Sequence, residues 1–399
     1  MGHLKNENQI SEGKVTLGGK KIVCRTYGFD EISLVPGKYT LDIDLCDTSF
    51  ILGKHKFSFP IIASAMDSVI SPHSAIELNT LGGLGVLNLQ GLYTRYENHE
   101  NILKQIIETD NENFVPLMQK LYQEPIKNEL IKKVIDEIKS SGSICAVSCT
   151  PNVANIYGLL VQDLGADILV VQSTVVSVEH KSNDKSACFN LKEFIQKMKI
   201  PVVVGNCVTY EVALEHMKAG ASAVLVGVGP GAACTSRGVL GIGVPMATAI
   251  ADCAQARDEY FSSTGRYVHV IGDGGMSVGG DICKAIACGA DAVMIGSPLA
   301  RAKEAPGKGF HWGMATPSPV LPRGTRIKVG TIGTLNEILL GPAKLDDGSQ
   351  NLVGALKKSM ATLGAQNIKE MQQVEVIIAP SILTEGKMFQ KAQKLGMGK

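Results

Sequence analysis

Residues 220–226 have the sequence GASAVLV, in which a glycine ends one element and an apolar run begins the next. The same unit recurs as GADILVV at 165–171 and as GADAVMI at 289–295. Glycine often ends a helix by adopting a left-handed conformation, and a short continuous apolar run is typical of a parallel strand covered on both faces. The repeat therefore predicts helices that alternate with buried strands.

Apolar runs of this kind form a series along most of the chain. They lie at 60–65, 84–89, 143–148, 167–172, 201–206, 223–228, 267–273 and 291–297. The segments between them have helical periodicity, as at 209–220, where Gly220 is expected to stop the helix. Eight strands alternating with helices predict an α/β fold, a closed (β/α)8 TIM barrel, with a doubly wound open sheet as the alternative.

The chain is expected to form one barrel domain with a tail at each end. We assign an N-terminal tail to 1–20, a single catalytic barrel to 21–380 and a C-terminal tail to 381–399. The long gap between the second and third strands, 90–142, contains amphipathic helical segments. We interpret this gap as a helical elaboration of the barrel rather than as a second domain.

Composition excludes several classes of function. The 399 residues carry 39 Lys and Arg against 38 Asp and Glu, so a net charge of +1 gives no electrostatic reason to expect nucleic acid or a membrane as partner. No apolar stretch is long enough for a membrane span, and the polar start lacks the apolar core of a secretory signal. Ten cysteines without a CxxC pair suggest reduced thiols. We therefore expect a cytoplasmic location.

Glycine-rich ends follow the last two predicted strands. Strand seven ends in GDGG at 272–275, and strand eight ends in GS at 296–297. Glycines let backbone N–H groups approach a phosphate, and Ser297 adds a hydroxyl. In such barrels the phosphate commonly binds at this place. The sequence therefore predicts a phosphate site at the ends of strands seven and eight.

The loop after strand six, 227–245, is rich in glycine and contains Cys234 followed by Thr235 and Ser236. A thiol in a polar loop at the catalytic face suits covalent attack on an electrophilic carbon. A structural thiol is the alternative on these features alone. No histidine adjoins Cys234, so a protease-type dyad is not indicated.

Four motifs resemble the IMP dehydrogenase / GMP reductase superfamily. They are SAMD at 64–67, GPGAACTSRGVLGIGVP at 229–245, DGG at 273–275 and MIGSPLARAKEAPG at 294–307. The resemblance covers about residues 25–370. The chain lacks the paired regulatory (Bateman-type) insert of many IMP dehydrogenases, and it is most similar to the short IMP-dehydrogenase-related branch.

The resemblance implies that Cys234 attacks C2 of a purine nucleoside 5′-monophosphate and that the adduct exchanges hydride with NADPH or NAD. The implied catalytic group is Cys234, Thr235 and Ser236. The implied substrate group is Ser64, Met66, Asp273, Gly274, Gly275, Gly296, Ser297, Gly313 and Met314, with Asp273 on the ribose hydroxyls. The implied cofactor group is Asn206, Gln172 and Gly227. Carbonyls of Gly229, Gly231 and Cys234 are the candidate K⁺ site, and a homotetramer is expected.

Departures from the family pattern bear on the direction of the reaction. The flap at 310–328 is short and has Arg323 and Arg326, but it lacks the Arg-Tyr pair that activates water in IMP dehydrogenases. The glutamate that helps ammonia leave in GMP reductases also has no clear counterpart. His311 replaces a tyrosine that often touches the phosphate.

On balance, the sequence favours a GMP reductase that converts GMP and NADPH to IMP and ammonia. Ammonia must be protonated as it leaves, and the Ser236 hydroxyl is suitably spaced from Cys234 to assist. IMP dehydrogenase, which converts IMP and NAD to XMP, is the alternative. A flavin-dependent barrel oxidoreductase and a catalytically silent nucleotide-binding regulator are the further alternatives.

Overall fold

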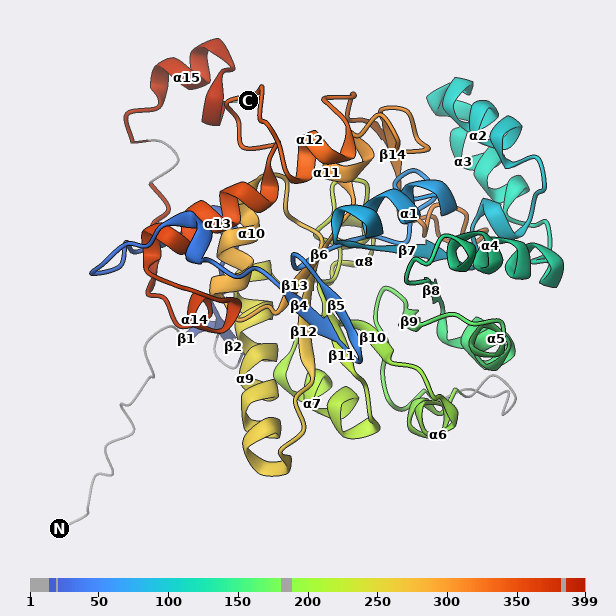
Figure 1. Cartoon of the computed structure of the whole chain (residues 1–399), viewed down its shortest axis with the longest axis horizontal. Coiled ribbons are helices and arrows are strands. Elements are labelled where there is room, and N and C mark those ends of the chain that lie inside the picture. The colour runs from blue at the N-terminus through green and yellow to red at the C-terminus, as the bar shows by residue number, and fades with distance from the viewer. Residues whose placement is uncertain (1–13, 19–20, 181–188, 382–384, 399) are drawn as a thin grey trace.

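A computed structural model describes residues 14–18, 21–180, 189–381 and 385–398 of the chain. Its central strands form a closed parallel barrel with helices around it, which confirms the predicted (β/α)8 fold (Figure 1). The barrel strands are β6 (Ile61–Ala63), β7 (Leu84–Asn88), β8 (Ala146–Cys149), β9 (Ile168–Gln172), β10 (Val202–Cys207), β11 (Ala223–Val226), β12 (His269–Asp273) and β13 (Ala292–Ile295). They neighbour one another in chain order, and β13 pairs with β6 to close the barrel.

Most strands lead into a helix on the outside of the barrel. These helices are α1 (Pro72–Leu81), α5 (Pro151–Asp163), α6 (Leu191–Lys197), α7 (Tyr210–Ala219), α9 (Met246–Thr264), α10 (Gly279–Ala287) and α11 (Ser297–Ala300). The repeated glycine behaves as the sequence predicts. Gly165, Gly220 and Gly289 have φ of +97°, +108° and +113°, a left-handed conformation that favours glycine where the chain turns from helix to strand.

Further helices and strand pairs surround this repeat. The helices are α2 (His99–Glu108), α3 (Asn111–Leu121), α4 (Asn128–Ser140), α8 (Ser236–Leu240), α12 (Leu335–Leu339), α13 (Leu352–Leu363), α14 (Ile368–Met371) and α15 (Met388–Gln393). The antiparallel pairs are β1 (Lys14–Leu17) with β2 (Lys21–Cys24), β3 (Ile32–Leu34) with β16 (Val376–Ile378), β4 (Phe50–Leu52) with β5 (His55–Phe57), and β14 (Phe310–Trp312) with β15 (Arg326–Lys328).

Apolar side chains fill the inside of the barrel. Val86, Val170 and Leu225 belong to one buried cluster with their neighbours on the other strands. Phe50 and Phe57 of the β4–β5 hairpin join that cluster, so the hairpin covers the end at which the strands begin. A ligand therefore has access to the barrel from the opposite end, where the strands finish.

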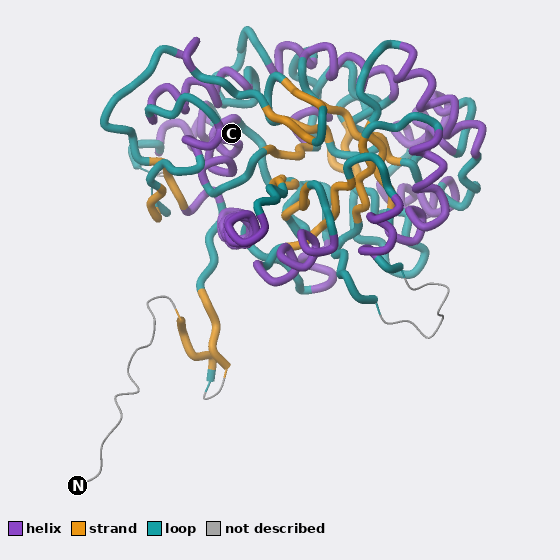
Figure 2. The backbone as a smooth tube through the Cα atoms, turned by 60° about the horizontal axis from the view of Figure 1, so that its bottom comes forward, coloured by secondary structure: helices purple, strands orange, loops and turns teal. Residues whose placement is uncertain are grey.

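The predicted elaboration and tails have defined structure in places. Segment 90–142 contains α2, α3 and α4, which cluster at one side of the barrel (Figure 1). Residues 14–17 of the expected N-terminal tail form β1, and the β1–β2 hairpin projects from the body (Figure 2). The expected tail 381–399 contains α15, whereas residues 1–13 lie outside the described residues. Within the described ranges, no helix has both the length and the apolarity needed to cross a membrane.

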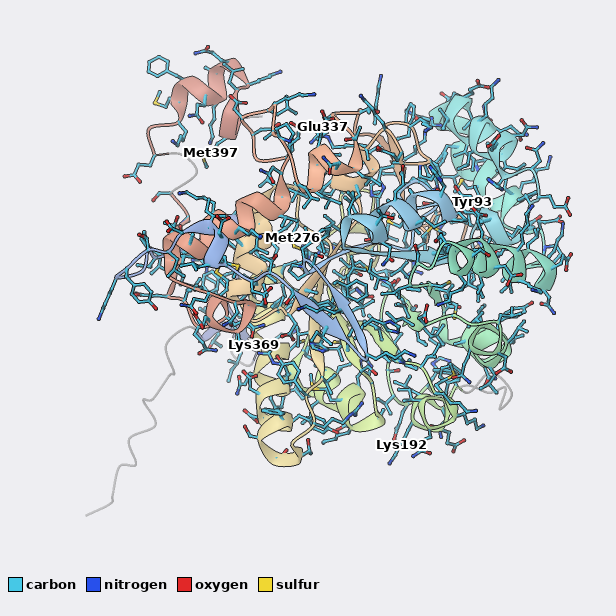
Figure 3. The ribbon with its side chains drawn as sticks, in the orientation of Figure 1. Tyr93, Lys192, Met276, Glu337, Lys369 and Met397 are labelled. Atoms are coloured by element: carbon cyan, nitrogen blue, oxygen red, sulfur yellow. The ribbon has the colours of Figure 1, made fainter. Side chains whose placement is uncertain are left out.

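One buried carboxylate organises the end of the barrel at which β12 and β13 begin. Asp291, only 3% exposed, accepts a hydrogen bond from the Val270 backbone N–H at 2.9 Å. It also accepts from the Arg257 guanidinium at 3.1 Å and pairs with Lys369 of α14 at 2.5 Å (Figure 3). The Tyr267 hydroxyl donates to it at 2.7 Å. This carboxylate thus joins α9, α14 and two barrel strands.

Asp291→Ala is expected to lower the free energy of unfolding by about 3 kcal/mol or more, because it removes the buried carboxylate that pairs with the buried Arg257 charge. Asp258→Ala is the matched control, since Asp258 binds the same guanidinium at 2.8 Å but is 61% exposed. Asp258→Ala is expected to lower the free energy of unfolding by only about 0–1 kcal/mol. Urea unfolding followed by circular dichroism measures both, and equal costs would contradict the role given to Asp291.

Candidate active site

A cavity of about 600 Å³ lies at the carboxyl ends of the barrel strands. It contains nearly all of the residues that the sequence predicted. They are Ser64, Met66, Gln172, Asn206, Gly227, Gly229, Gly231, Cys234, Ser236, Asp273, Gly274, Gly275, Gly296, Ser297, Gly313 and Met314. Thr235 is the exception, because the chain turns into α8 directly after Cys234 and successive side chains there face different sides. We therefore remove Thr235 from the predicted catalytic group.

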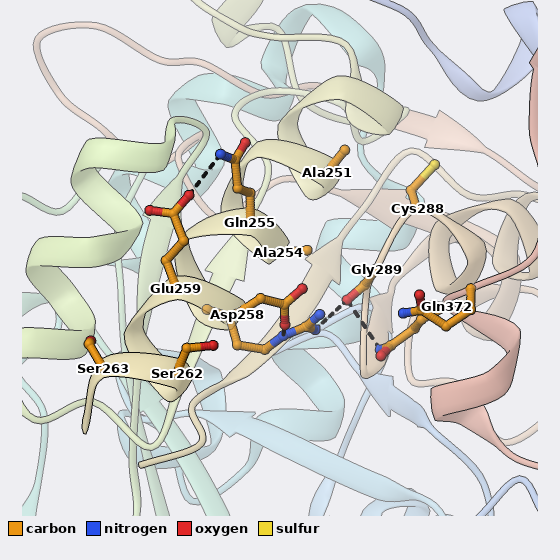
Figure 4. Close-up of a pocket in the computed structure, with 12 residues that line it drawn as sticks. Ala251, Ala254, Gln255, Asp258, Glu259, Ser262, Ser263, Cys288, Gly289 and Gln372 are labelled. Atoms are coloured by element: carbon orange, nitrogen blue, oxygen red, sulfur yellow. Dashed lines mark hydrogen bonds and ion pairs between the residues drawn. The ribbon is translucent and has the colours of Figure 1, made fainter. Parts of the chain in front are cut away.

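A second hollow lies on the outside of the barrel. It is bordered by α9 residues such as Asp258, by Gly289 and by Gln372 (Figure 4). Gly289 precedes β13, so this hollow is near the start of the strands rather than at their carboxyl ends. It contains none of the predicted catalytic or phosphate-binding residues, and we place the candidate active site in the first cavity.

The carboxylate of Asp273 stands at the end of β12 and is held by two amides. Gln172 donates to Asp273 Oδ2 at 2.8 Å, and Asn206 donates to the same oxygen at 2.7 Å. Asn206 also donates to the Gly227 carbonyl at 2.7 Å. Burial raises the pKa of Asp273 to about 6, against the lowering effect of the amide hydrogen bonds. The two amides therefore fix Oδ2 in place, which leaves Oδ1 to accept bonds from a ligand.

Cys234 is partly exposed in the cavity. Its Sγ donates to the Ser236 hydroxyl oxygen at 3.3 Å. The backbone of Cys234 forms an isolated antiparallel bridge with Gly324, so the loop 227–245 is joined to the flap. The bridge to the flap therefore supports the loop at Cys234, and the thiol faces the cavity beside the Ser236 hydroxyl.

The ends of β12 and β13 have the geometry expected of a phosphate cradle. Gly274 and Gly275 have φ of +80° and +77°, which only glycine adopts readily, and both residues line the cavity beside Pro230. Ser297 follows at the end of β13, and His311 lies against Gly296. Burial lowers the pKa of His311 to about 4, and its Nδ1 is 3.1 Å from Ser68 Oγ. His311 is therefore neutral near pH 7 and offers a hydrogen bond rather than a charge.

The flap is a hairpin that is fastened to the helical elaboration. Strands β14 and β15 pair, and residues 313–325 connect them. The Arg326 guanidinium donates to the Thr109 carbonyl at 2.7 Å and lies 5.0 Å from the Phe114 ring centroid. Arg326 therefore anchors the flap to α2 and α3 outside the cavity. Arg323 does line the cavity, where it donates to Thr174 Oγ1 at 3.1 Å.

The sequence analysis missed several cavity residues, and two of them bear on the chemistry of the site. Arg95 and Tyr122 both line the cavity, although they come from the elaboration at 90–142. The Arg95 guanidinium lies 5.6 Å from the centroid of the Tyr122 ring. The sequence carried no motif for this pair because the two residues lie far apart along the chain. The helical elaboration thus contributes directly to the site.

Comparisons with known proteins agree with this geometry. Residues 26–315 match the family model of the IMP dehydrogenase / GMP reductase domain. The chain belongs to this family. An uncharacterized oxidoreductase of Mycobacterium leprae is 41% identical over 374 residues, covering 92% of this chain and 100% of that protein. The inosine-5′-monophosphate dehydrogenase of Methanocaldococcus jannaschii is 27% identical, covering 90% of this chain and 93% of that protein.

A solved structure of an IMP dehydrogenase/GMP reductase-like protein from Corynebacterium glutamicum superimposes with a TM-score of 0.87. The two chains are 38% identical, and the match covers 92% of this chain and 98% of that one. Membership in the IMP dehydrogenase / GMP reductase family makes the chain an oxidoreductase. The individual residue roles inside that cavity rest on its geometry.

Asp273→Asn is expected to weaken binding of a ribonucleotide by roughly 10- to 100-fold, the equivalent of a charge-assisted hydrogen bond. An amide offers one acceptor oxygen in place of two, and its NH₂ would oppose the donors of Gln172 and Asn206. The loss should be smaller for the 2′-deoxynucleotide. Calorimetric titration with GMP, IMP and their deoxy forms measures the difference.

Asp281→Asn is the matched control, since the Asp281 carboxylate accepts from the Ser277 backbone N–H at 2.9 Å and does not line the cavity. It should leave nucleotide binding unchanged. Wild-type affinity of Asp273→Asn for both ribo- and deoxyribonucleotides would refute the ribose assignment.

Proposed function

We propose that this protein is a nicotinamide-dependent oxidoreductase that acts at C2 of a purine nucleoside 5′-monophosphate through a covalent bond to Cys234. The observation that carries the proposal is that the Cys234 thiol, the Asp273 carboxylate and the glycine-rich strand ends line one cavity. These groups supply a nucleophile, a ribose acceptor and a phosphate cradle. The hollow bordered by α9 and Gly289 contains none of these groups.

Each residue has one task in this proposal. Asp273 accepts from the ribose hydroxyls, and the backbone of Gly275 with the Ser297 hydroxyl binds the phosphate. This fixes the base so that C2 faces Cys234 Sγ, which adds to it. A bound nicotinamide would supply hydride transfer at C2. The hydroxyls of Ser173 and Thr174, which follow β9, fit a carboxamide ring because a hydroxyl can both donate and accept, whereas the Gln172 amide is already bonded to Asp273.

We propose oxidation of IMP to XMP as the working direction. Three relatives with a specific name are inosine-5′-monophosphate dehydrogenases. Among the described residues, the cavity lining contains no glutamate, which a reductase of this family would use to protonate departing ammonia. It does contain Arg95 and Tyr122, so the absence of an Arg-Tyr pair from the flap no longer argues against oxidation.

Reduction of GMP is the second candidate. It is favoured by the Ser236 hydroxyl, which lies 3.3 Å from Cys234 Sγ and could assist a leaving amine. The choice between NAD and NADPH follows the direction, with NAD for oxidation and NADPH for reduction.

The carbonyls of Gly229, Gly231 and Cys234 are our proposed K⁺ site. The Gly231 carbonyl accepts the Cys234 N–H at 3.0 Å, and its second lone pair is available to a cation. Carbonyl oxygens suit a hard monovalent ion, and a bound ion would hold the loop in one conformation. The homotetramer implied by the family resemblance stays a prediction.

A matrix of nucleotides and cofactors tests the direction. IMP with NAD is expected to give XMP with a rise in absorbance at the nicotinamide band, faster than GMP with NADPH gives IMP and ammonia. Each reaction is run with K⁺ and with Na⁺. Ammonia release from GMP without XMP formation from IMP would reverse the assignment. Tight nucleotide binding without turnover, or a flavin absorbance in the purified protein, would overturn it altogether.

A further inference from the structure

A buried carboxylate lies behind the cavity and is connected to it through one side chain. Asp67 follows β6 and is only 1% exposed. The Leu92 backbone N–H donates to its Oδ2 at 2.9 Å, and the Tyr122 hydroxyl donates to the same oxygen. Gly91 leaves room for Asp67, because a Cβ at that position would overlap with Oδ1. The carboxylate is therefore built into the wall of the site.

Tyr122 connects this carboxylate to the cavity. It is the C-terminal cap residue of α3, and it lines the same cavity as Cys234. Its hydroxyl proton is directed to Asp67, and the Trp312 indole N–H faces the phenol oxygen, which has a second lone pair for a ligand or water. Burial and the Asp67 charge raise the pKa of Tyr122 well above its usual value, so the phenol stays protonated.

Arg95 fixes the ring of Tyr122 in place. Its guanidinium stacks near the ring, and its Nε donates to the Gln90 carbonyl at 2.9 Å. It also donates to the Glu124 carbonyl on the other side of Tyr122. These contacts position the phenol between the cavity and Asp67, at the point where the elaboration meets the barrel.

We propose that Tyr122 and Asp67 form a proton relay that serves the second half of the reaction, in which the nucleotide is released from Cys234. This inference rests on the proposed function above. Tyr122 contacts the reacting water and is a catalytic residue, whereas Arg95 is a positioning residue. The relay stands in for the Arg-Tyr pair that the short flap lacks.

The relay begins after the hydride has left C2. A water oxygen bonds to C2, and one water proton moves to Tyr122 Oη as the phenol proton moves to Asp67. The C2–S bond then breaks, and its electron pair returns to Cys234 Sγ. The proton held by Asp67 restores the thiol, so the hydroxyl is on the purine and the second hydrogen is on sulfur. In the reductive direction, the same two groups would give a proton to departing ammonia.

The relay has a defined pH dependence. Burial raises the pKa of Asp67 to about 6, and the groups that face it are Tyr122, Arg95 and Tyr93. Neither tyrosine is ionised near neutral pH, since burial raises both of their pKa values. Because the ionised carboxylate is the proton acceptor, the rate of nucleotide release should rise as pH increases through about 6.

Tyr122→Phe tests the relay directly. With IMP and NAD, this variant should still release one equivalent of reduced cofactor per site in a burst, while steady turnover falls by about 10²- to 10⁴-fold, the usual effect of general acid–base catalysis. Intact-mass spectrometry of quenched samples should find the nucleotide adduct on most of the enzyme. Binding of IMP without cofactor should stay unchanged.

Tyr96→Phe is the matched control, since the Tyr96 hydroxyl donates to the Leu121 carbonyl at 2.8 Å beside Tyr122 but does not line the cavity. It should behave as wild type. Asp67→Asn should also accumulate adduct and lose the pH dependence near 6. Wild-type turnover without adduct in Tyr122→Phe would overturn the relay alone. A complete absence of burst and adduct from the wild-type enzyme would overturn the proposed function instead.

Discussion

The site depends on the hydrogen bonds that hold the Asp273 carboxylate at the mouth of the barrel. Two amides, from Gln172 on β9 and Asn206 on β10, donate to one oxygen of a residue on β12. Each strand must therefore end at the correct height for the three side chains to meet. The parallel ladder sets that height, and the β4–β5 hairpin covers the other end of the barrel. The fold thus places at the mouth a carboxylate that two amides already hold in one orientation.

The same mouth joins three chemically distinct regions. The glycine-rich ends of β12 and β13 offer bare backbone, the loop 227–245 presents a thiol, and the helical elaboration supplies Tyr122. The flap completes the enclosure, because Arg326 fastens it to the carbonyls at the end of α2. The flap itself brings Arg323 into the cavity, and the neighbouring wall adds Arg95 and Tyr122.

Sequence reasoning located the barrel and most of the cavity, for physical reasons. Buried parallel strands need continuous apolar runs, and a left-handed turn needs glycine, so Gly220 and its counterparts mark the repeat unambiguously. Asp67 belongs to the SAMD motif, but its contact with Tyr122 escaped notice because it joins segments 55 residues apart. Thr235, which was predicted to be catalytic from its position next to Cys234, is the N-cap residue of α8 and does not line the cavity. The hydrogen bond from Gln172 to Asp273 likewise could not be predicted from the spacing of these residues in the sequence.

Peptide mapping of the wild-type enzyme tests the central claim, covalent chemistry at Cys234, most directly. The chain has ten cysteines, so the position of an adduct distinguishes a nucleophile from a merely accessible thiol. Enzyme quenched in acid during turnover of IMP and NAD would be digested and analysed by tandem mass spectrometry. The account predicts a purine nucleotide on the peptide that contains Cys234, and on no other cysteine. Turnover with an unmodified Cys234 peptide throughout, or a nucleotide bound to a different cysteine, would contradict it.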